Sequence, residues 1–250
     1  MRLSVDELLK RALKPGYFAA RRVVSALVID RRLGLDTARE VRVADLRLGG
    51  PDRLGYEASA WRVLPKILPP DEVTPDEVFL DYGSGKGRVL YQAARQYPFR
   101  RVFGVELSEE LNTVARANIA RSASRLRCPD VEIVTMDATE YRLPDDVSVV
   151  YLYNPFRGEV FADVVANVVA SLDRRPRQMR VIYRTPLEEE ALLGTGRFRL
   201  VRTKQGLRPT RAWRRTSSTR MYVSLLTPEG VPGTSRHPVG EAAGRGPGLR

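Results

Sequence analysis

The chain has little of what disulfides, zinc sites and membrane spans require. Its 250 residues contain one cysteine, Cys128, and one histidine, His237. A single cysteine excludes an internal disulfide and fits a reducing compartment, and this pair cannot supply a zinc site of His and Cys ligands. The sequence has no run of about 18 apolar residues and no apolar signal-peptide core at its start. These absences predict a cytoplasmic protein with no metal and no membrane partner.

Lysine is also scarce, although the chain is strongly basic. The formal net charge is +12, yet only five of the 42 basic residues are lysines. A basic surface is one signature of nucleic-acid binding. An arginine-rich composition also arises from compositional bias alone, so the charge leaves both explanations open.

What the sequence does contain is a glycine-rich stretch, Val78–Arg88, that follows an apolar run. Its glycines stand at alternate positions, and apolar residues then recur at helical spacing. This pattern predicts a buried strand, a tight loop and a helix. Glycine is needed where the backbone turns sharply or touches a ligand, and the start of the following helix presents unpaired N–H groups to a polar ligand.

Neighbouring residues exclude two of the ligand-binding loops that contain such glycines. A P-loop needs a hydroxyl residue after Gly-Lys, but Gly87 follows Lys86. A dinucleotide-binding loop needs a small residue where Arg88 stands. The remaining pattern, Asp-x-Gly-x-Gly-x-Gly, fits a different cofactor loop or a purely structural turn.

Strands and helices are expected to alternate between Glu77 and Leu193, which predicts an α/β fold with a parallel sheet and right-handed crossovers. Two further strands, Phe198–Thr203 and Met221–Leu226, have no helix between them and predict a terminal antiparallel pair. The five earlier strands are expected at 78–81, 101–106, 131–136, 147–153 and 179–183.

The chain divides into three predicted regions. Residues 1–70 predict a helical cap or lid, in which Pro15-Gly16 ends a first helix and a later helix spans Tyr56–Leu68. Residues 71–228 predict the α/β domain. Residues 229–250 have almost no large apolar side chain and predict a disordered tail.

Polar residues stand where four of the predicted parallel strands end. Ligands of open α/β sheets bind outside the carboxyl ends of the strands. Glu106 lies 23 residues past Gly83, about where an acid that binds both hydroxyls of a ribose is expected. The four strand-end residues are Asp81, Glu106, Asp137 and Asn154.

Together these motifs resemble the class I S-adenosylmethionine (SAM) methyltransferases, in a bacterial group mostly without assigned substrates. The likeness spans about Tyr56–Pro228. It implies a Rossmann-like class I methyltransferase sheet, mostly parallel with a terminal antiparallel hairpin, an N-terminal helical cap, and SAM as cofactor. It is carried by the segments Val78–Arg88, Tyr97-Pro98-Phe99, Gly104-Val105-Glu106 and Tyr153-Asn154-Pro155-Phe156.

The resemblance also implies roles for individual residues. Glu106 would bind the ribose, Asp137 the adenine amine, and Asp81 the amino group of the methionine part, which would lie along the glycine loop. Tyr56 and Glu57 are candidates for a lid. The complete predicted cofactor-binding set is Asp81, Tyr82, Gly83, Gly85, Gly87, Glu106, Leu107, Asp137, Ala138 and Asn154.

Asn154-Pro155-Phe156 is the predicted catalytic motif, because it stands where amino methyltransferases carry Asn/Asp-Pro-Pro-Tyr/Phe. In that motif oxygens of the first two residues accept hydrogen bonds from the amine, and the aromatic ring packs against the acceptor. This chain lacks the second proline, so a structural turn at Asn154 stays open as an alternative. With no histidine nearby to act as a base, a nitrogen acceptor on a protein or small molecule is favoured over oxygen.

A basic loop between the last two predicted strands keeps nucleic acid open as the acceptor. Basic side chains around Trp213 suit phosphate binding and base stacking, and they equally suit an acidic protein or plain solvent. A non-catalytic SAM- or nucleoside-binding module is the alternative from another functional class. The basic residues of the loop are Lys204, Arg208, Arg211, Arg214, Arg215 and Arg220.

Overall fold

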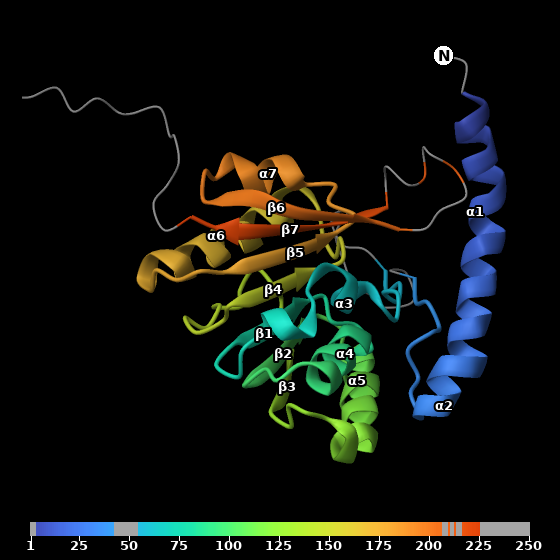
Figure 1. Ribbon diagram of the computed structural model, residues 1–250, viewed down its shortest axis with the longest axis horizontal. Helices are drawn as coiled ribbons and strands as arrows, with labels where there is room; N and C mark the ends of the chain where they lie inside the picture. The colour runs from blue at the N-terminus through green and yellow to red at the C-terminus, as the bar shows by residue number, and fades with distance from the viewer. Residues whose placement is uncertain (1–3, 43–54, 207–209, 211–212, 214–216, 226–250) are drawn as a thin grey trace, which may run out of the picture.

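A seven-stranded sheet forms the centre of the protein, with helices on both of its faces (Figure 1). The computed structural model describes residues 4–42, 55–206, 210, 213 and 217–225. The strand order is β3-β2-β1-β4-β5-β7-β6. The strands are β1 (Val78–Tyr82), β2 (Arg101–Glu106), β3 (Val131–Thr135), β4 (Val149–Leu152), β5 (Arg180–Arg184), β6 (Phe198–Gln205) and β7 (Ser218–Ser224).

The order of the strands confirms the predicted class of sheet. Strands β1 to β5 are parallel, and β7 runs antiparallel to both β5 and β6. Strand β7 therefore lies between β5 and β6 in the sheet. The main helices that connect and flank these strands are α4 (Arg88–Gln96), α5 (Glu109–Ser122), α6 (Gly158–Arg174) and α7 (Glu189–Gly194).

Two apolar clusters hold the helices against the sheet. Successive side chains of a strand point to opposite faces, and β1 shows this clearly. Val78, Leu80 and Tyr82 pack in one cluster with α6, whereas Phe79 packs in the other with α4. Strand β1 is buried on both faces. Its one acidic residue, Asp81, lies near its carboxyl end.

The N-terminal region differs from its prediction at Pro15. Helix α1 (Val5–Val24) continues through Pro15 and Gly16 instead of ending there. A proline inside a helix removes the hydrogen bond that its own amide would donate, and its ring crowds the carbonyl four residues earlier. Pro15 and Arg11 are exposed, so the freed carbonyl can tilt outward and bind water. The chain then continues through the π-helix η1 (Ser25–Asp30) and α2 (Arg31–Leu33).

The predicted helix over Tyr56–Leu68 is wrong for its first half. Only α3 (Val63–Ile67) is helical, followed by the 3-10 helix η3 (Pro70–Glu72). Tyr56 instead forms an antiparallel bridge with Val41. The carbonyls of Ala58 and Ser59 accept hydrogen bonds from arginine side chains, which helical backbone amides would otherwise supply.

Ser108 caps α5, because its hydroxyl accepts a hydrogen bond from the Leu111 amide at 3.2 Å. The predicted tail, 229–250, lies outside the described residues, as do Arg208, Arg211, Arg214 and Arg215. No helix within the described parts of the chain is long and apolar enough to cross a membrane.

Candidate active site

A cavity of about 900 Å³, including its open mouth, lies at the carboxyl ends of β1, β2 and β4. This is the edge at which ligands of open α/β sheets bind. Nine of the residues predicted for the site line the cavity together. They are Asp81, Gly83, Glu106, Leu107, Asp137, Ala138, Asn154, Pro155 and Phe156.

Three residues predicted for the cofactor do not line this cavity. Tyr82 is fully buried, and its ring packs against Tyr141 in the core. Gly87 lies against Ala115 of α5, where an added Cβ would meet the Ala115 Cβ at 3.1 Å. The alternation of side chains along β1 explains Tyr82, because a residue that follows Asp81 points to the other face of the sheet.

Gly85 makes room for a protein side chain. A Cβ added at Gly85 would lie 2.2 Å from the Tyr56 ring, and one added at Gly83 would lie 2.5 Å from the Pro155 ring. Both glycines also have positive φ, +53° and +73°, which side chains with a Cβ rarely adopt. The methionine part of the cofactor is expected along the glycine loop, but at Gly85 the ring of Tyr56, a residue of the N-terminal region, covers the backbone.

Glu106 connects the end of β2 to the glycine loop. Its two carboxylate oxygens accept hydrogen bonds from the backbone amides of Gly85 and Ser108, each at 3.0 Å. Burial raises the pKa of Glu106, and the hydrogen bonds from Ser108 and Gly85 oppose that shift. Each oxygen keeps acceptor capacity toward the cavity, which suits a pair of vicinal hydroxyls.

Asp81 is the more exceptional acid, because it is 3% exposed and no described residue donates a hydrogen bond to its carboxylate. Burial raises its pKa well above the ordinary value, and the nearby negative charge of Glu106 raises it further. A buried carboxylate without a partner is costly in the folded protein. A ligand that brings a positive charge or hydrogen-bond donors would therefore stabilise the Asp81 carboxylate.

Asp137, at the end of β3, is partly engaged by its own turn. Its Oδ1 accepts hydrogen bonds from the Thr139 amide at 3.0 Å and the Thr139 hydroxyl at 2.9 Å. The turn fixes the carboxylate at the cavity wall beside Ala138. No group of three or more His, Cys, Asp or Glu side chains within the described parts of the chain is arranged to hold a metal ion.

Asn154 follows β4 in a backbone conformation that is unusual for a residue with a side chain. Its φ is +43°, a left-handed conformation that costs energy for any residue other than glycine. Its Oδ1 is buried and has no hydrogen-bond partner among the described residues. Strain and an unpaired buried amide at one cavity-lining position point to a functional site.

The N-terminal region forms one wall of the cavity. Tyr56, Glu57 and Ser59 line it, and the Tyr56 ring lies against Gly85 of the glycine loop. The Tyr153 hydroxyl donates to Glu57 at 2.9 Å, and the hydroxyls of Ser59 and Tyr151 are hydrogen-bonded at 3.0 Å. The expected lid residues Tyr56 and Glu57 are thus at the cavity, and two tyrosines of the β4 segment hold this wall in place.

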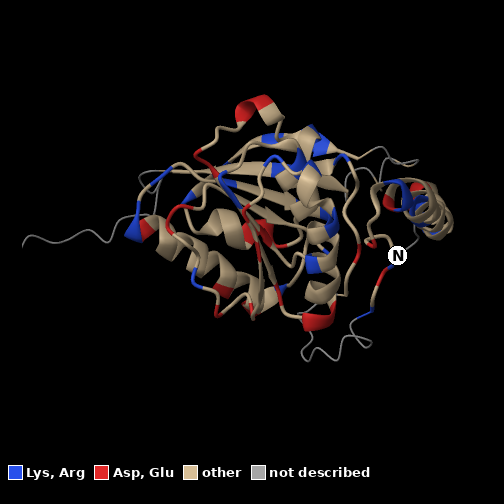
Figure 2. Cartoon of the chain, turned by 90° about the horizontal axis from the view of Figure 1, so that it is seen from below, with Lys and Arg blue, Asp and Glu red and all other residues tan. Residues whose placement is uncertain are grey.

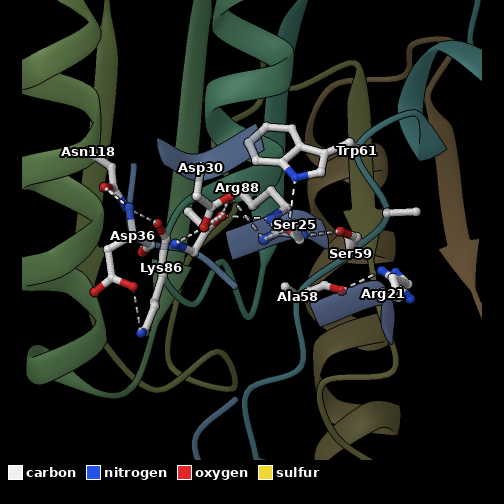
Figure 3. A network of polar contacts seen from close by, with 12 residues as sticks. Arg21, Ser25, Asp30, Asp36, Ala58, Ser59, Trp61, Lys86, Arg88 and Asn118 are labelled. Atoms are coloured by element: carbon white, nitrogen blue, oxygen red, sulfur yellow. Dashed lines mark hydrogen bonds and ion pairs between the residues drawn. The ribbon is translucent and has the colours of Figure 1, made fainter. Parts of the chain in front are cut away.

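Arg88, which follows the glycine loop, anchors that wall through a buried network (Figure 3). Its guanidinium donates to the Thr37 hydroxyl at 2.7 Å, the Ser59 carbonyl at 3.0 Å and the Ser25 hydroxyl at 2.8 Å. The same group lies 3.4 Å from the Asp30 carboxylate. The network ties helix α4 to the N-terminal region at residues 25, 30, 37 and 59.

The Arg88 network is almost inaccessible to solvent, because Arg88 is 3% and Asp30 4% exposed. Burial lowers the pKa of Arg88. The guanidinium also lies 4.6 Å from the centre of the Trp61 ring, in a cation–π arrangement. Sequence reasoning used Arg88 only to exclude a dinucleotide loop; an arginine in the first turn of a buried helix is itself a signal for such a network.

A second polar cluster connects the glycine loop to the same region (Figure 3). Lys86 is 5% exposed and its Nζ lies 3.4 Å from the Asp36 carboxylate. Asn118 of α5 donates to the carbonyls of Lys86 at 2.9 Å and Asp36 at 3.1 Å, and it accepts from the Asp36 amide at 2.9 Å. Lys86 and Arg88 therefore both hold the N-terminal region against the glycine loop and helix α4.

Residues 79–175 match the family described as "Methyltransferase domain". This match extends from β1 through α6, and together with the strand order and the strand-end residues it supports a SAM-dependent methyltransferase domain in that part of the chain. Among curated proteins, a protein-lysine N-methyltransferase of Saccharolobus islandicus (strain REY15A) is 30% identical over 67 residues. That match covers 27% of this chain and 42% of the relative.

Two solved structures resemble the chain at low identity. A ribosomal protein L11 methylase from Lactobacillus delbrueckii subsp. bulgaricus is 18% identical, with 59% of this chain and 69% of that chain covered and a TM-score of 0.42. A magnesium protoporphyrin IX methyltransferase from Synechocystis PCC 6803, solved with bound SAM, is 17% identical, with 60% and 70% covered and a TM-score of 0.41. At this level of similarity neither structure bears on what the present chain acts on.

The cavity residues fit SAM on two observations of the structure itself. The unpartnered Asp81 carboxylate suits the positively charged end of the cofactor, and Glu106 has free acceptor capacity for ribose hydroxyls. The cavity also has apolar walls for an adenine ring at Leu107 and Ala138. When bound, SAM supplies a methyl group on a sulfonium sulfur.

Replacing Asp81 by asparagine is expected to stabilise the ligand-free protein at neutral pH and to weaken SAM binding. The pKa of Asp81 is raised in the folded state, so the penalty of its charge is absent below the ordinary aspartate pKa. The penalty grows as the pH rises from there through the raised pKa. Urea unfolding should show a gain of about 1–3 kcal/mol at pH 8 that disappears toward pH 4.

The exposed Asp76 provides the matched control, since Asp76→Asn should change the stability little at either pH. A wild-type protein that is more stable than Asp81→Asn at pH 8 would contradict the assignment, because it would mean that the Asp81 charge has a stabilising partner. Calorimetric titration with SAM measures the expected loss of SAM affinity in Asp81→Asn.

Proposed function

We propose that this protein is a SAM-dependent methyltransferase that transfers the methyl group to a nitrogen atom, on a protein side chain or a small-molecule amine. The observation that carries the proposal is Asn154, which lines the cavity in a left-handed backbone conformation and whose buried Oδ1 has no hydrogen-bond partner among the described residues. An amide oxygen without a donor is suited to accept a hydrogen bond from an amine N–H. Pro155 and Phe156 complete the cavity wall beside it.

The tyrosines around the cavity support nitrogen over oxygen as the acceptor. Burial raises the pKa of Tyr56, Tyr151 and Tyr153, so these phenols stay protonated at neutral pH and are poor bases. A hydroxyl acceptor would need its proton removed during the reaction, whereas an uncharged amine attacks without prior loss of a proton. The described cavity wall therefore suits an amine.

Glu57 supports an acceptor that arrives with a positive charge. Its carboxylate lines the cavity, its side chain is 42% exposed, and it accepts the hydrogen bond of the Tyr153 hydroxyl. Arg21 lies 4.0 Å away, at the limit of an ion pair. A partly exposed carboxylate at the cavity can attract an ammonium group. The ammonium group then loses a proton to solvent and becomes the uncharged amine that attacks.

Two of the described residues weaken the nucleic-acid alternative. Trp213 is 2% exposed and its ring packs edge-on against Tyr17 of α1 at 5.0 Å, so its faces do not form an open stacking platform. Arg220 is paired with Glu189. Lys204 is exposed, and the other basic residues of that loop lie outside the described residues.

Label transfer from methyl-tritiated SAM into fractionated cell extract tests the proposal. We expect label in protein or in small amines, and we expect chemical blocking of primary amines in the extract to remove most of it. Pretreatment of a parallel sample with ribonuclease serves as the control and should leave the incorporation unchanged.

Label that enters RNA would contradict a protein or small-molecule acceptor. Label that survives amine blocking in an ester or ether linkage would contradict a nitrogen acceptor. SAM binding in calorimetry without any label transfer would instead favour a non-catalytic SAM-binding module. Label in amines with unchanged yield for Asn154→Ala would leave the acceptor class intact but remove Asn154 from the mechanism.

A further inference from the structure

Helix α1 turns its polar side toward the domain. Arg21 donates a hydrogen bond to the Ala58 carbonyl at 2.8 Å, and Tyr17 and Phe18 pack against Trp213. The π-helix that continues α1 places Ser25 in the Arg88 network. These contacts fix the rotation of the helix about its axis, so its opposite side cannot turn toward the domain.

The opposite side is apolar and exposed. At the amino end the exposed side chains are Val5, Leu8, Leu9 and Leu13, between 45% and 73% exposed. At the carboxyl end they are Val23, Val24, Leu27 and Val28, between 53% and 63% exposed. We call this surface, together with the small residues between its two ends, the outer stripe.

The outer stripe lies at one edge of the molecule. Figure 1 shows α1 standing beside the sheet and its helices, and Figure 2 shows it nearly end-on at the same edge. From Val5 to Val28 it extends over about 36 Å of helix. Monomeric soluble proteins rarely expose a contiguous apolar surface of this extent, which indicates that something covers it.

We infer that a second copy of this chain covers the outer stripe, in an antiparallel two-fold pairing of the two α1 helices centred on Gly16. The stripe is self-complementary about that point. Large side chains occupy its two ends, whereas its middle holds only small exposed residues, Ala12, Gly16, Ala19 and Ala20. Small residues let two helix axes approach closely where they cross, and the large ends of one copy then meet the opposite ends of the other.

Charge at the ends of the stripe favours the antiparallel direction. Arg31 and Arg32 are exposed just beyond the carboxyl end, and Asp6 and Glu7 lie in the first turn. A parallel pair would bring the arginines of both copies together. An antiparallel pair places the basic end of each helix toward the acidic end of the other, which is the complementary arrangement, and a two-fold axis makes both ends equivalent.

A membrane surface fits the stripe less well. Helices that lie in a membrane interface carry Trp or Phe on the apolar side. The aromatic residues of α1, Tyr17 and Phe18, instead face Trp213 within the protein. Two of its basic residues, Arg21 and Arg22, make contacts within the chain at Ala58 and Glu40.

Oxidative cross-linking of variants with one added cysteine tests both the partner and the direction. The native Cys128 is buried and serves as the background. In the antiparallel pair Gly16→Cys faces its own copy and should form a disulfide-linked dimer, because a disulfide needs Cα atoms within about 7 Å. Leu9→Cys should not, since the two residues would lie about 21 Å apart along the helices.

Light scattering after size-exclusion chromatography supplies the second measurement. We expect the wild type at twice the monomer mass, and Val23→Glu to raise the dissociation constant of the dimer at least about tenfold. Leu200→Glu is the matched control, because Leu200 is a 44% exposed apolar residue on β6, away from α1. Circular dichroism verifies that each variant is folded.

Three results would overturn the inference. A monomeric wild type at high concentration with no Gly16→Cys cross-link would remove the second copy. Efficient cross-linking of Leu9→Cys would indicate a parallel pair. Binding of the monomer to anionic lipid vesicles, abolished by Val23→Glu, would assign the stripe to a membrane surface instead.

Discussion

Replacing Arg88 by methionine is expected to lower the free energy of unfolding by about 3–5 kcal/mol. Methionine keeps much of the length of the side chain but leaves the Asp30 carboxylate, 4% exposed, without its positive partner. It also leaves the Ser59 carbonyl without the donor at 3.0 Å. Urea unfolding followed by circular dichroism measures the loss, and SAM affinity below the transition measures its effect on the cavity wall.

Two further variants separate the charge from the packing. Asp30→Asn in the Arg88→Met background should recover part of the lost stability, because the uncompensated charge is then gone. Arg95→Met on the same helix should change stability by less than about 1 kcal/mol, because Arg95 interacts with the side chain of Tyr91, one turn earlier on that helix, and neutralises no buried charge. A single Arg88→Met variant as stable as the wild type would contradict the anchoring role.

Replacing Asn154 by alanine is expected to lower turnover about 10²–10³-fold while SAM affinity changes little. The amide oxygen would no longer hold the amine in line with the methyl group, and misplacement of a reacting atom is costly to rate. The variant should also lose about 1–2 kcal/mol of stability, because alanine tolerates the φ of +43° poorly. Steady-state kinetics and calorimetric titration with SAM measure the two effects separately.

Asn154→Gly distinguishes the amide from the backbone. Glycine adopts a positive φ without strain, so this variant keeps the turn after β4 and removes only the side chain. We expect it to be as inactive as Asn154→Ala but more stable. An active Asn154→Gly enzyme would show that the position serves the conformation of the loop alone.

The two predictions concern different parts of one arrangement. Asn154 is proposed to act on the acceptor at the cavity wall, whereas Arg88 holds the N-terminal region, which forms another part of that wall. A loss of SAM affinity with intact chemistry is therefore expected from Arg88 variants, and the reverse from Asn154 variants. Measuring both SAM affinity and turnover for each variant therefore separates the two roles.

The sequence alone determined the sheet and the edge at which the site lies. The apolar run before Asp81, the glycine loop and the polar residues at 106, 137 and 154 are local patterns. Parallel strands bring their carboxyl ends to one edge, so naming the residue at each strand end was enough to place these side chains around one cavity. Periodicity within each element carries this information.

Only the tertiary structure decided which side chains meet. Arg88 and Asp30 are 58 residues apart in the chain, Tyr56 covers Gly85, and Trp213 packs against Tyr17. The periodicity of a segment reports that a face is buried but not what buries it. Contacts between distant segments depend on the packing of the whole chain, and for this reason the Arg88 network and the outward apolar side of α1 became visible only in the fold.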